Sequence, residues 1–433
     1  MTFGNDSPPA SPSADQQRDA LRKGLGRAAQ WAATGRLDES ALLAACLTDQ
    51  RYDQQVETGR GAWLWRMVLA AGSAERFRGA ILHALRELPD ERSVNQLCEL
   101  ARFYAEAGDA PFRTRLYEIV ERKPVAGCEW VGEDEILALD GEPAFLFAAG
   151  VRGRILATDT AAWDNGDLVR RAVERFGADR VDALFASSPD DGVRRYWKNW
   201  LDATARQAGR KTVPSFRDQV RATTVDDVLE QARGNARGPL FRRWGALAEA
   251  ADLRTVLCRL WAADEPKEIA ALLSAFSDRA LPEFDPRLID LCRHAAPDVR
   301  RRAWAALEQN AHPLVREFAL ERLAQGMPDA AVVGLFVRNY HSGDEQRILE
   351  ALTLPADEDD LHWLLTSVSE LLKNNPGADA ARLGLIVYAS TPCNTCRRDA
   401  AKLLHTRGVA PEWLREECRH DAGEDCRNLF AQG

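Results

Sequence analysis

The stretch PDVRRRAWAALEQNAHPLVREFALERLAQG, residues 297–326, repeats one short phrase after sixteen residues. The two copies share Pro, Val, Arg, Ala and Leu, which are Pro297, Val299, Arg300, Ala303 and Leu307 in the first copy and Pro313, Val315, Arg316, Ala319 and Leu323 in the second. Apolar residues four and eight positions apart lie on one face of a helix, and Pro is common at the first helical position. The stretch therefore predicts two consecutive amphipathic helices joined by a short turn.

Weaker copies of the phrase occur at three other places. Their matching residues are Val193, Arg194, Trp197 and Leu201, then Cys396, Arg397, Ala400 and Leu404, and finally Cys426 and Arg427. One helix of this length is only marginally stable in water, whereas stacked copies bury a continuous core. In such a stack, we expect each Arg to reach a carboxylate or a turn carbonyl of the adjacent unit. The residues expected to fix the stacking are Asp298, Val299, Arg300, Val315, Arg316, Arg397 and Arg427.

The run Asp298-Val299-Arg300, with Ala303 and Leu307, resembles the second helix of a HEAT repeat, which belongs to the armadillo-like class. The resemblance is clear over residues 297–323 and fair over 187–201 and 391–430. It implies an all-α protein, a right-handed α-solenoid built from HEAT-like helical hairpins. The chain departs from the family in two ways. The repeated phrase returns after one helix and a turn instead of a full two-helix repeat of ~40 residues, and no Asp precedes Val315.

The sequence also predicts how the chain is divided. Residues 1–18, rich in Ser, Pro and Asp, are expected to form a disordered leader. An N-terminal helical-repeat region follows over 19–205, then a linker or long loop over 206–219, then a C-terminal HEAT-like repeat region over 220–433. The one stretch with strand-like character, residues 129–159, is better explained by two short helices that are broken at Asp140-Gly141.

Composition places the chain among folded proteins, with 45% hydrophobic and 28% charged residues among 433. Its 57 basic and 66 acidic residues give a net charge of −9, which argues against a dedicated nucleic-acid binder. No apolar run approaches the ~20 residues of a membrane span, and the N-terminus lacks the features of a signal peptide. Nine scattered cysteines fit reduced thiols. We therefore expect a cytoplasmic protein that does not associate with membranes.

The C-terminal region holds a candidate metal site, formed by Cys393, Cys396, Cys418, His420 and Cys426. Zinc takes four nitrogen or sulfur ligands in a tetrahedron, and this set could supply them. The competing interpretation is core packing, because Cys396 and Cys426 occupy the apolar position of Val299, and buried Cys behaves as a small hydrophobic residue. No second CxxC is present. The sequence favours packing, and we expect no cofactor.

Arginine pairs stand next to tryptophans at three places, which suggests a nucleic-acid surface. The residues concerned are Arg194, Arg195, Trp197, Arg242, Arg243, Trp244, Arg300 and Arg301. The competing interpretation is that the Trp rings pack between helices and the Arg side chains are solvated, and the net charge favours it. Motifs for nucleophilic hydrolysis (GxSxG), phosphate binding (GxxxxGK) and dinucleotide binding (GxGxxG) are absent, so no catalytic activity is predicted.

Three functions are compatible with this pattern. The first is a non-enzymatic scaffold or adaptor that binds a protein partner on its concave face. The second is a nucleic-acid-binding or base-excising protein, since HEAT-like folds include DNA glycosylases. Base excision would require an acidic residue inside the Arg/Trp groove, and the sequence does not identify one. The third is an accessory subunit that regulates an enzyme.

Overall fold

The computed structural model describes residues 9, 11–88, 90–122, 130–159, 162–208, 214–234, 239–326 and 329–430. Residues 1–8 and 10 of the predicted leader, 129 of the doubtful stretch and 209–213 of the predicted linker lie outside these ranges. Within them, the regular structure is entirely α-helical and contains no strand, which confirms the all-α prediction. None of these helices has the length and apolar character needed to cross a membrane.

The chain divides into two compact units. Unit 2 contains Pro8–Lys211 together with Arg415–Gly433. Its helices are α1 (Ala14–Lys23), α2 (Gly26–Ala33), α3 (Glu39–Leu47), α4 (Gly61–Ala70), α5 (Ala74–Glu87), α6 (Val94–Glu106), α7 (Ala110–Arg122), α8 (Glu133–Asp140), α9 (Glu142–Thr158), α10 (Asp167–Phe176), α11 (Ala178–Ser187), α12 (Asp191–Ala208), the end of α26 (Glu412–Cys418), and α27 (Glu424–Asn428).

Unit 1 contains Thr212–Leu414. Its helices are α13 (Phe216–Ala222), α14 (Val225–Arg233), α15 (Pro239–Leu247), α16 (Ala250–Ala262), α17 (Pro266–Ser274), α18 (Arg287–Leu291), α19 (Pro297–Leu307), α20 (Pro313–Ala324), α21 (Ala330–Asn339), α22 (Asp344–Ala351), α23 (Glu358–Asn374), α24 (Ala381–Ser390), α25 (Asn394–Thr406), and the start of α26.

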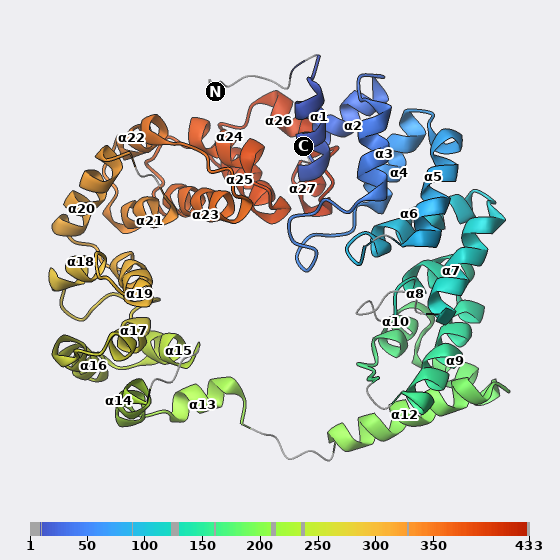
Figure 1. Ribbon diagram of the computed structural model, residues 1–433, viewed down its shortest axis with the longest axis horizontal. Coiled ribbons are helices and arrows are strands. Elements are labelled where there is room, and N and C mark those ends of the chain that lie inside the picture. Colours follow the sequence, from blue (N-terminus) through green and yellow to red (C-terminus); the bar gives the residue numbers. More distant parts are fainter. Residues whose placement is uncertain are drawn as a thin grey trace. The chain divides into compact units, whose positions relative to one another are not determined.

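The helices of unit 1 form two rows (Figure 1). Helices α17, α19, α21 and α23 contact one another in sequence and make one row. Helices α20, α22 and α24 make the other, and α20 packs on α21 across the rows. Unit 2 has the same arrangement, because α1, α3, α5 and α7 contact in order, as do α2, α4, α6 and α8. Each helix therefore packs against neighbours that lie close in the sequence.

The repeated phrase forms α19 and α20, and its apolar residues are the buried ones. Val299, Ala303 and Leu307 of α19 have no exposed surface, and neither do Val315 and Ala319 of α20. The two helices do not form one hairpin, because α19 packs on α17 and α18, whereas α20 packs on α21. The phrase thus occurs once in α19, the second helix of one hairpin, and once in α20, the first helix of the next hairpin. It recurs because both helices must bury an apolar face against their neighbours.

The weaker copies are buried less uniformly. Val193 is buried in α12, but Leu201 at the expected apolar position is 48% exposed. Cys426 and Ala400 are buried, while Cys396 is only half-buried. The late position is exposed in α12, where Leu201 lies, but buried in α25, where Leu404 has no exposed surface, so it is a core position only in some copies.

The arginines of the phrase make different contacts. Arg316 of α20 donates two hydrogen bonds to Asp344 at the start of α22, at 2.6 and 2.9 Å, and so joins consecutive helices of one row. Arg300 and Arg427 instead donate to backbone carbonyls of the turn that precedes their own helix. Arg397 is fully buried within α25. The side chain of Asp298 pairs with Arg301 on the same helix.

Local capping chemistry explains where several helices begin and end. Helix α1 starts at Ala14, inside the stretch predicted as leader, because Ser13 and Gln16 form a capping box. Helices α8 and α9 meet at Gly141, as the sequence predicted, and this residue adopts a φ of 60°. Helix α23 begins after Asp357, whose carboxylate accepts hydrogen bonds from the backbone of Asp359 and Asp360.

The last residues of the chain pack against the first helices of unit 2, whereas the sequence placed them in one region over 220–433. Arg27 of α2 donates to both oxygens of Glu417, at 3.0 and 2.9 Å. The Trp63 indole of α4 donates to the His420 carbonyl at 2.9 Å. Glu417 is completely buried. A buried ion pair and an indole bond cannot be inferred from helical periodicity, so this long-range closure was not predicted.

Candidate functional site

A groove runs along one row of unit 1, across α19, α21 and α23. It has a volume of ≈ 860 Å³. Each helix contributes a stripe of residues spaced three or four apart, on the side opposite its buried stripe. The lining residues are Pro297, Arg300, Arg301, Trp304, Ala305, Glu308, Gln309, Asp329, Ala330, Ala331, Gly334, Val337, Arg338, Trp363, Thr366, Ser367, Glu370 and Asn374.

Residue size accounts for the hollow. The middle helix, α21, lines the groove with Ala330, Ala331 and Gly334 and so has little bulk at its centre. The flanking helices carry Trp304 on α19 and Trp363 on α23. Trp363 is 61% exposed, which is unusual for the largest apolar side chain. Small side chains on the middle helix, between helices that carry tryptophans, leave a groove that can bind a segment of another molecule.

The arginines of the groove differ in how their charge is compensated. Arg301 forms an ion pair with Asp298 at 2.6 Å. Arg338 donates to the neutral Gln309 amide at 3.1 Å, and Arg300 donates to two backbone carbonyls. Within the described residues, no carboxylate pairs with Arg300 or Arg338. Two positive charges of the groove therefore remain uncompensated.

The carboxylates of the groove show a matching pattern. Glu370 pairs with Lys373 at 3.2 Å. Asp329 caps α21 by accepting from the Val332 backbone at 2.9 Å, and no described side chain forms an ion pair with it. Glu308 has neither a hydrogen-bond donor nor a cation as partner among the described residues. Two carboxyl groups of the groove are thus also without a cationic partner among the described residues.

Glu308 is the chemically most unusual residue of the groove. It is half-buried beside Gly334, and burial raises the pKa of its carboxyl group to about 7. The negative charge of Asp329 adds to this rise in the pKa. A half-buried carboxyl group with a raised pKa and no partner is a feature of binding and catalytic sites more often than of a structural surface.

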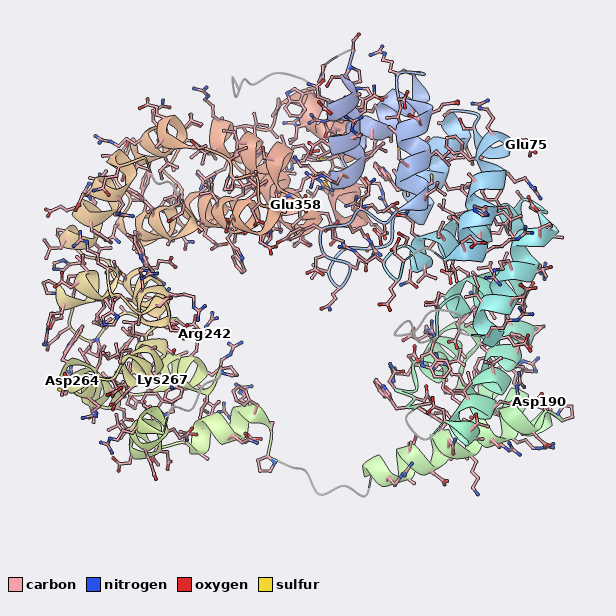
Figure 2. The ribbon with its side chains drawn as sticks, in the orientation of Figure 1. Glu75, Asp190, Arg242, Asp264, Lys267 and Glu358 are labelled. Atoms are coloured by element: carbon pink, nitrogen blue, oxygen red, sulfur yellow. The ribbon has the colours of Figure 1, made fainter. Side chains whose placement is uncertain are left out.

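Within unit 1, the predicted Arg/Trp residues do not share one role. Arg300 and Arg301 line the groove. Arg242, labelled in Figure 2, is held by two hydrogen bonds to Asp278 at 2.7 Å, while Arg243 next to it is exposed. Trp244 is buried and donates to a backbone carbonyl at 3.0 Å. It therefore serves helix packing.

The remaining Arg/Trp residues belong to unit 2. Arg194 pairs with Asp191 on its own helix at 2.5 Å, and Arg195 is exposed. The Trp197 ring stacks on Phe185 with centroids 4.3 Å apart. This ring is therefore engaged in packing between α11 and α12.

The predicted metal residues belong to both units. Cys393 and Cys396 lie in unit 1 at the start of α25, together with His362 of α23. Cys418, His420 and Cys426 lie in unit 2. Within the described residues, no group of three potential ligands contains any of these last three. Cys418 and Cys426 are buried. We name His362, Cys393 and Cys396 the thiol–imidazole cluster.

The thiol–imidazole cluster has a defined geometry. The ligand atoms of its three residues lie within 4.8 Å of one another, and Cys396 Sγ is 3.9 Å from His362 Nδ1. Cys393 is the N-cap residue of α25 and is 6% exposed. A hydrogen bond from Cys396 and the backbone amides of the helix start lower the pKa of the Cys393 thiol to about 6.

Comparison of the chain with protein-family models, with curated proteins and with solved structures gives no match.

Sequence reasoning did not identify the central residues of either feature. Glu308, Arg338, Trp363 and His362 were not assigned to a site. A signal for the groove was present, because residues 297, 300, 301, 304 and 308 follow helical spacing opposite the core stripe. The sequence does not show which helices stand beside that stripe, so the groove could not be assembled from it.

Proposed function

We propose that the chain is a cytoplasmic, non-enzymatic scaffold, a right-handed HEAT-like α-solenoid that binds a segment of a protein partner in the groove of unit 1. The observation that carries the proposal is the charge pattern of the groove. Two arginines and two carboxyl groups have no ionic partner among the described residues, and they lie between the half-buried ring of Trp304 and the exposed ring of Trp363. A partner of the same mixed character would satisfy all four charges.

The chemistry of the groove specifies the partner segment. Glu308 and Asp329 would accept a Lys or Arg side chain, whose alkyl stem can lie along Trp304. Arg338 and Arg300 would donate to an Asp or Glu, and Arg is suited to such paired hydrogen bonds. Apolar residues between these charges would cover Trp363. Aromatic and Arg side chains contribute disproportionately to binding energy at protein interfaces, which fits this set.

The first experiment places a photo-crosslinking amino acid at Trp363 in the full chain, expressed in its own host. The matched control carries the same amino acid at Trp163, which is 63% exposed and belongs to unit 2. We expect one nuclease-resistant protein adduct at position 363 and none at 163. Adducts of equal abundance at both positions would contradict the proposal.

A second experiment tests the charge pattern. The partner segment identified by crosslinking should contain both a basic and an acidic residue, and Glu308→Arg should weaken its binding at least ~10-fold through like-charge repulsion. Arg243→Glu, at an exposed position outside the groove, is the matched control and should leave the affinity unchanged. An unaffected affinity for Glu308→Arg would place the binding site elsewhere.

The second candidate function is nucleic-acid binding, with base excision as its enzymatic form. Glu308 favours it, because an acidic residue stands beside Arg300 and Trp304, as base excision would require. The groove is lined by three arginines and three carboxylates, however, and phosphate contacts depend on a net positive surface. Strong duplex binding that weakens steeply with salt, and is lost in Arg300→Ala, would favour this function. If the crosslinked partner is an enzyme whose turnover changes on binding, the chain is its accessory subunit.

A further inference from the structure

The thiol–imidazole cluster brings soft metal-ligating atoms together from two different helices. His362 stands in the second turn of α23, whereas Cys393 and Cys396 begin α25, thirty or more residues later in the sequence. The chain packs α23 against α25 and thereby places one imidazole beside two thiols. A CxxC segment alone does not require a third donor, so the position of His362 is an independent observation.

The distances between the ligand atoms of the cluster are close to those around a metal ion with tetrahedral coordination. Bonds of about 2.0 Å to nitrogen and 2.3 Å to sulfur place neighbouring ligand atoms roughly 3.5–3.8 Å apart. Cys396 Sγ and His362 Nδ1 are 3.9 Å apart, and all three ligand atoms lie within 4.8 Å. Small side-chain rotations would complete the geometry.

The donor set also selects the kind of metal. Two thiolates and one imidazole are ligands that zinc prefers, whereas magnesium and calcium require oxygen atoms. Cys393 lies at the N-terminus of α25, where helix amides favour the thiolate form that metals bind. The site is also sheltered, because Cys393 is buried and the other two ligands are half-buried.

We propose that His362, Cys393 and Cys396 bind one zinc ion and leave its fourth coordination position to an exogenous ligand. Within the described residues, no further His, Cys, Asp or Glu belongs to the group. Three protein ligands with one open position characterise zinc sites that bind water or a small ligand, whereas structural sites have four protein ligands.

The site adjoins the groove. Thr366 lines the groove and its Oγ1 lies 3.8 Å from Cys396 Sγ. Zinc at this position would join α23 to α25 directly behind the groove wall that carries Trp363. The inference concerns the metal alone and does not depend on what the groove binds.

The test uses the full chain, reduced and freed of metal with a chelator, then titrated with Zn²⁺ and with Co²⁺. We expect one ion per chain. The Co²⁺ form should show the visible bands of tetrahedral coordination and a near-ultraviolet thiolate-to-cobalt charge-transfer band. Cys393→Ser and Cys396→Ser should each weaken Zn²⁺ binding by more than ~100-fold, since even changes outside the ligand shell cost roughly 10–100-fold.

Three further variants make the result decisive. His362→Ala should weaken Zn²⁺ binding, and His362→Cys should restore it and strengthen the charge-transfer band by adding a third thiolate. Cys258→Ser removes an exposed thiol of α16 and should change nothing. Far-ultraviolet circular dichroism of each variant verifies that the helices are retained.

The proposal fails if reduced protein takes up no Zn²⁺, or if uptake is unchanged in His362→Ala. It also fails if Cys418→Ala or Cys426→Ala abolishes uptake while the variants of the thiol–imidazole cluster retain it. A Cys393–Cys396 disulfide that forms in air, together with no uptake by the reduced protein, would assign the pair to thiol redox chemistry instead.

Discussion

The carboxyl group of Glu308 lies directly against Gly334 of the neighbouring helix. A Cβ atom at position 334 would stand 2.8 Å from Glu308 Cδ and 2.8 Å from Oε1, closer than atoms in contact approach. The absence of a side chain at Gly334 therefore lets Glu308 lie on α21 inside the groove. The same close approach removes water from the carboxyl group, which explains why its pKa is raised.

Replacing Glu308 should reveal this raised pKa as a dependence of stability on pH. The pKa of this carboxyl group is higher in the folded protein than in the unfolded chain. As the pH rises from the unfolded-state pKa to the folded-state pKa of about 7, the unfolded chain ionises first and the folded protein loses stability. We expect Glu308→Gln to stabilise unit 1 by on the order of 1–3 kcal/mol at pH 8. This advantage should disappear towards pH 4, where the carboxyl group is protonated in both states.

Urea unfolding at pH 4, 6 and 8 measures this difference. Glu317→Gln, at an exposed position of α20, is the control and should show no such pH dependence. An equal effect of Glu308→Gln at pH 4 and pH 8 would contradict the interpretation.

Arg152 should be the most sensitive charged residue of unit 2. Its side chain is fully buried and bonds Glu133 at 2.9 and 2.5 Å and Asp167 at 2.8 Å. Arg152→Met would leave the buried Glu133 with Arg171, at 3.1 Å, as its remaining described cation, at a cost of about 3 kcal/mol. Arg154→Met is the control on the same helix, because its contact with Asp190 is 3.8 Å long and half-exposed. We expect it to cost less than about 1 kcal/mol.

Thermal and urea unfolding of both variants provide the measurement. Similar losses for Arg152→Met and Arg154→Met would show that the buried network does not stabilise the unit. Replacing the pair together, as Arg152→Met with Glu133→Leu, should recover part of the loss because the fully buried carboxylate is removed with its cation.

The closure of unit 2 by the last residues of the chain can be tested at Gly26. A Cβ atom there would stand 1.9 Å from the Glu417 carbonyl oxygen, which belongs to the backbone and cannot rotate away. Gly26→Ala should therefore displace residues 415–430. Hydrogen exchange of the α2 and α4 amides should then become faster.

Gly79→Ala provides the matched control in the same unit. Gly79 lies within α5, and nothing stands within 4 Å of a Cβ atom at that position. Alanine is the better helix former, so this change should stabilise α5 by about 0.5–1 kcal/mol. Equal exchange rates in the Gly26→Ala and Gly79→Ala variants would contradict the predicted closure.

The ion pair between Arg316 and Asp344 should stabilise the stacking of α20 on α22. The side chain of Asp344 is only 1% exposed, so Arg316→Ala would leave a buried carboxylate without its cation. We expect a loss of about 2–3 kcal/mol, measured by hydrogen exchange of the α20 and α22 amides. Arg301→Ala removes an exposed pair on one helix and should cost less than about 1 kcal/mol.

The sequence alone determined the helical character of the chain and much of its core. The spacing of Val299, Ala303 and Leu307 identified a buried face, and Pro297 and Pro313 marked two helix starts. These features could be predicted because a helix imposes its period and its capping needs on residues at most a few positions apart.

The tertiary structure alone decided which helices are neighbours, and the candidate sites depend on that choice. His362 meets Cys393 because α23 packs against α25, and Glu308 enters the groove because α19 approaches Gly334 of α21. Arg27 forms an ion pair with Glu417, which lies 390 residues later in the sequence. Many helices could bury the same apolar stripes, so their partners are selected by the summed packing and hydrogen bonding of distant segments, which no local pattern records.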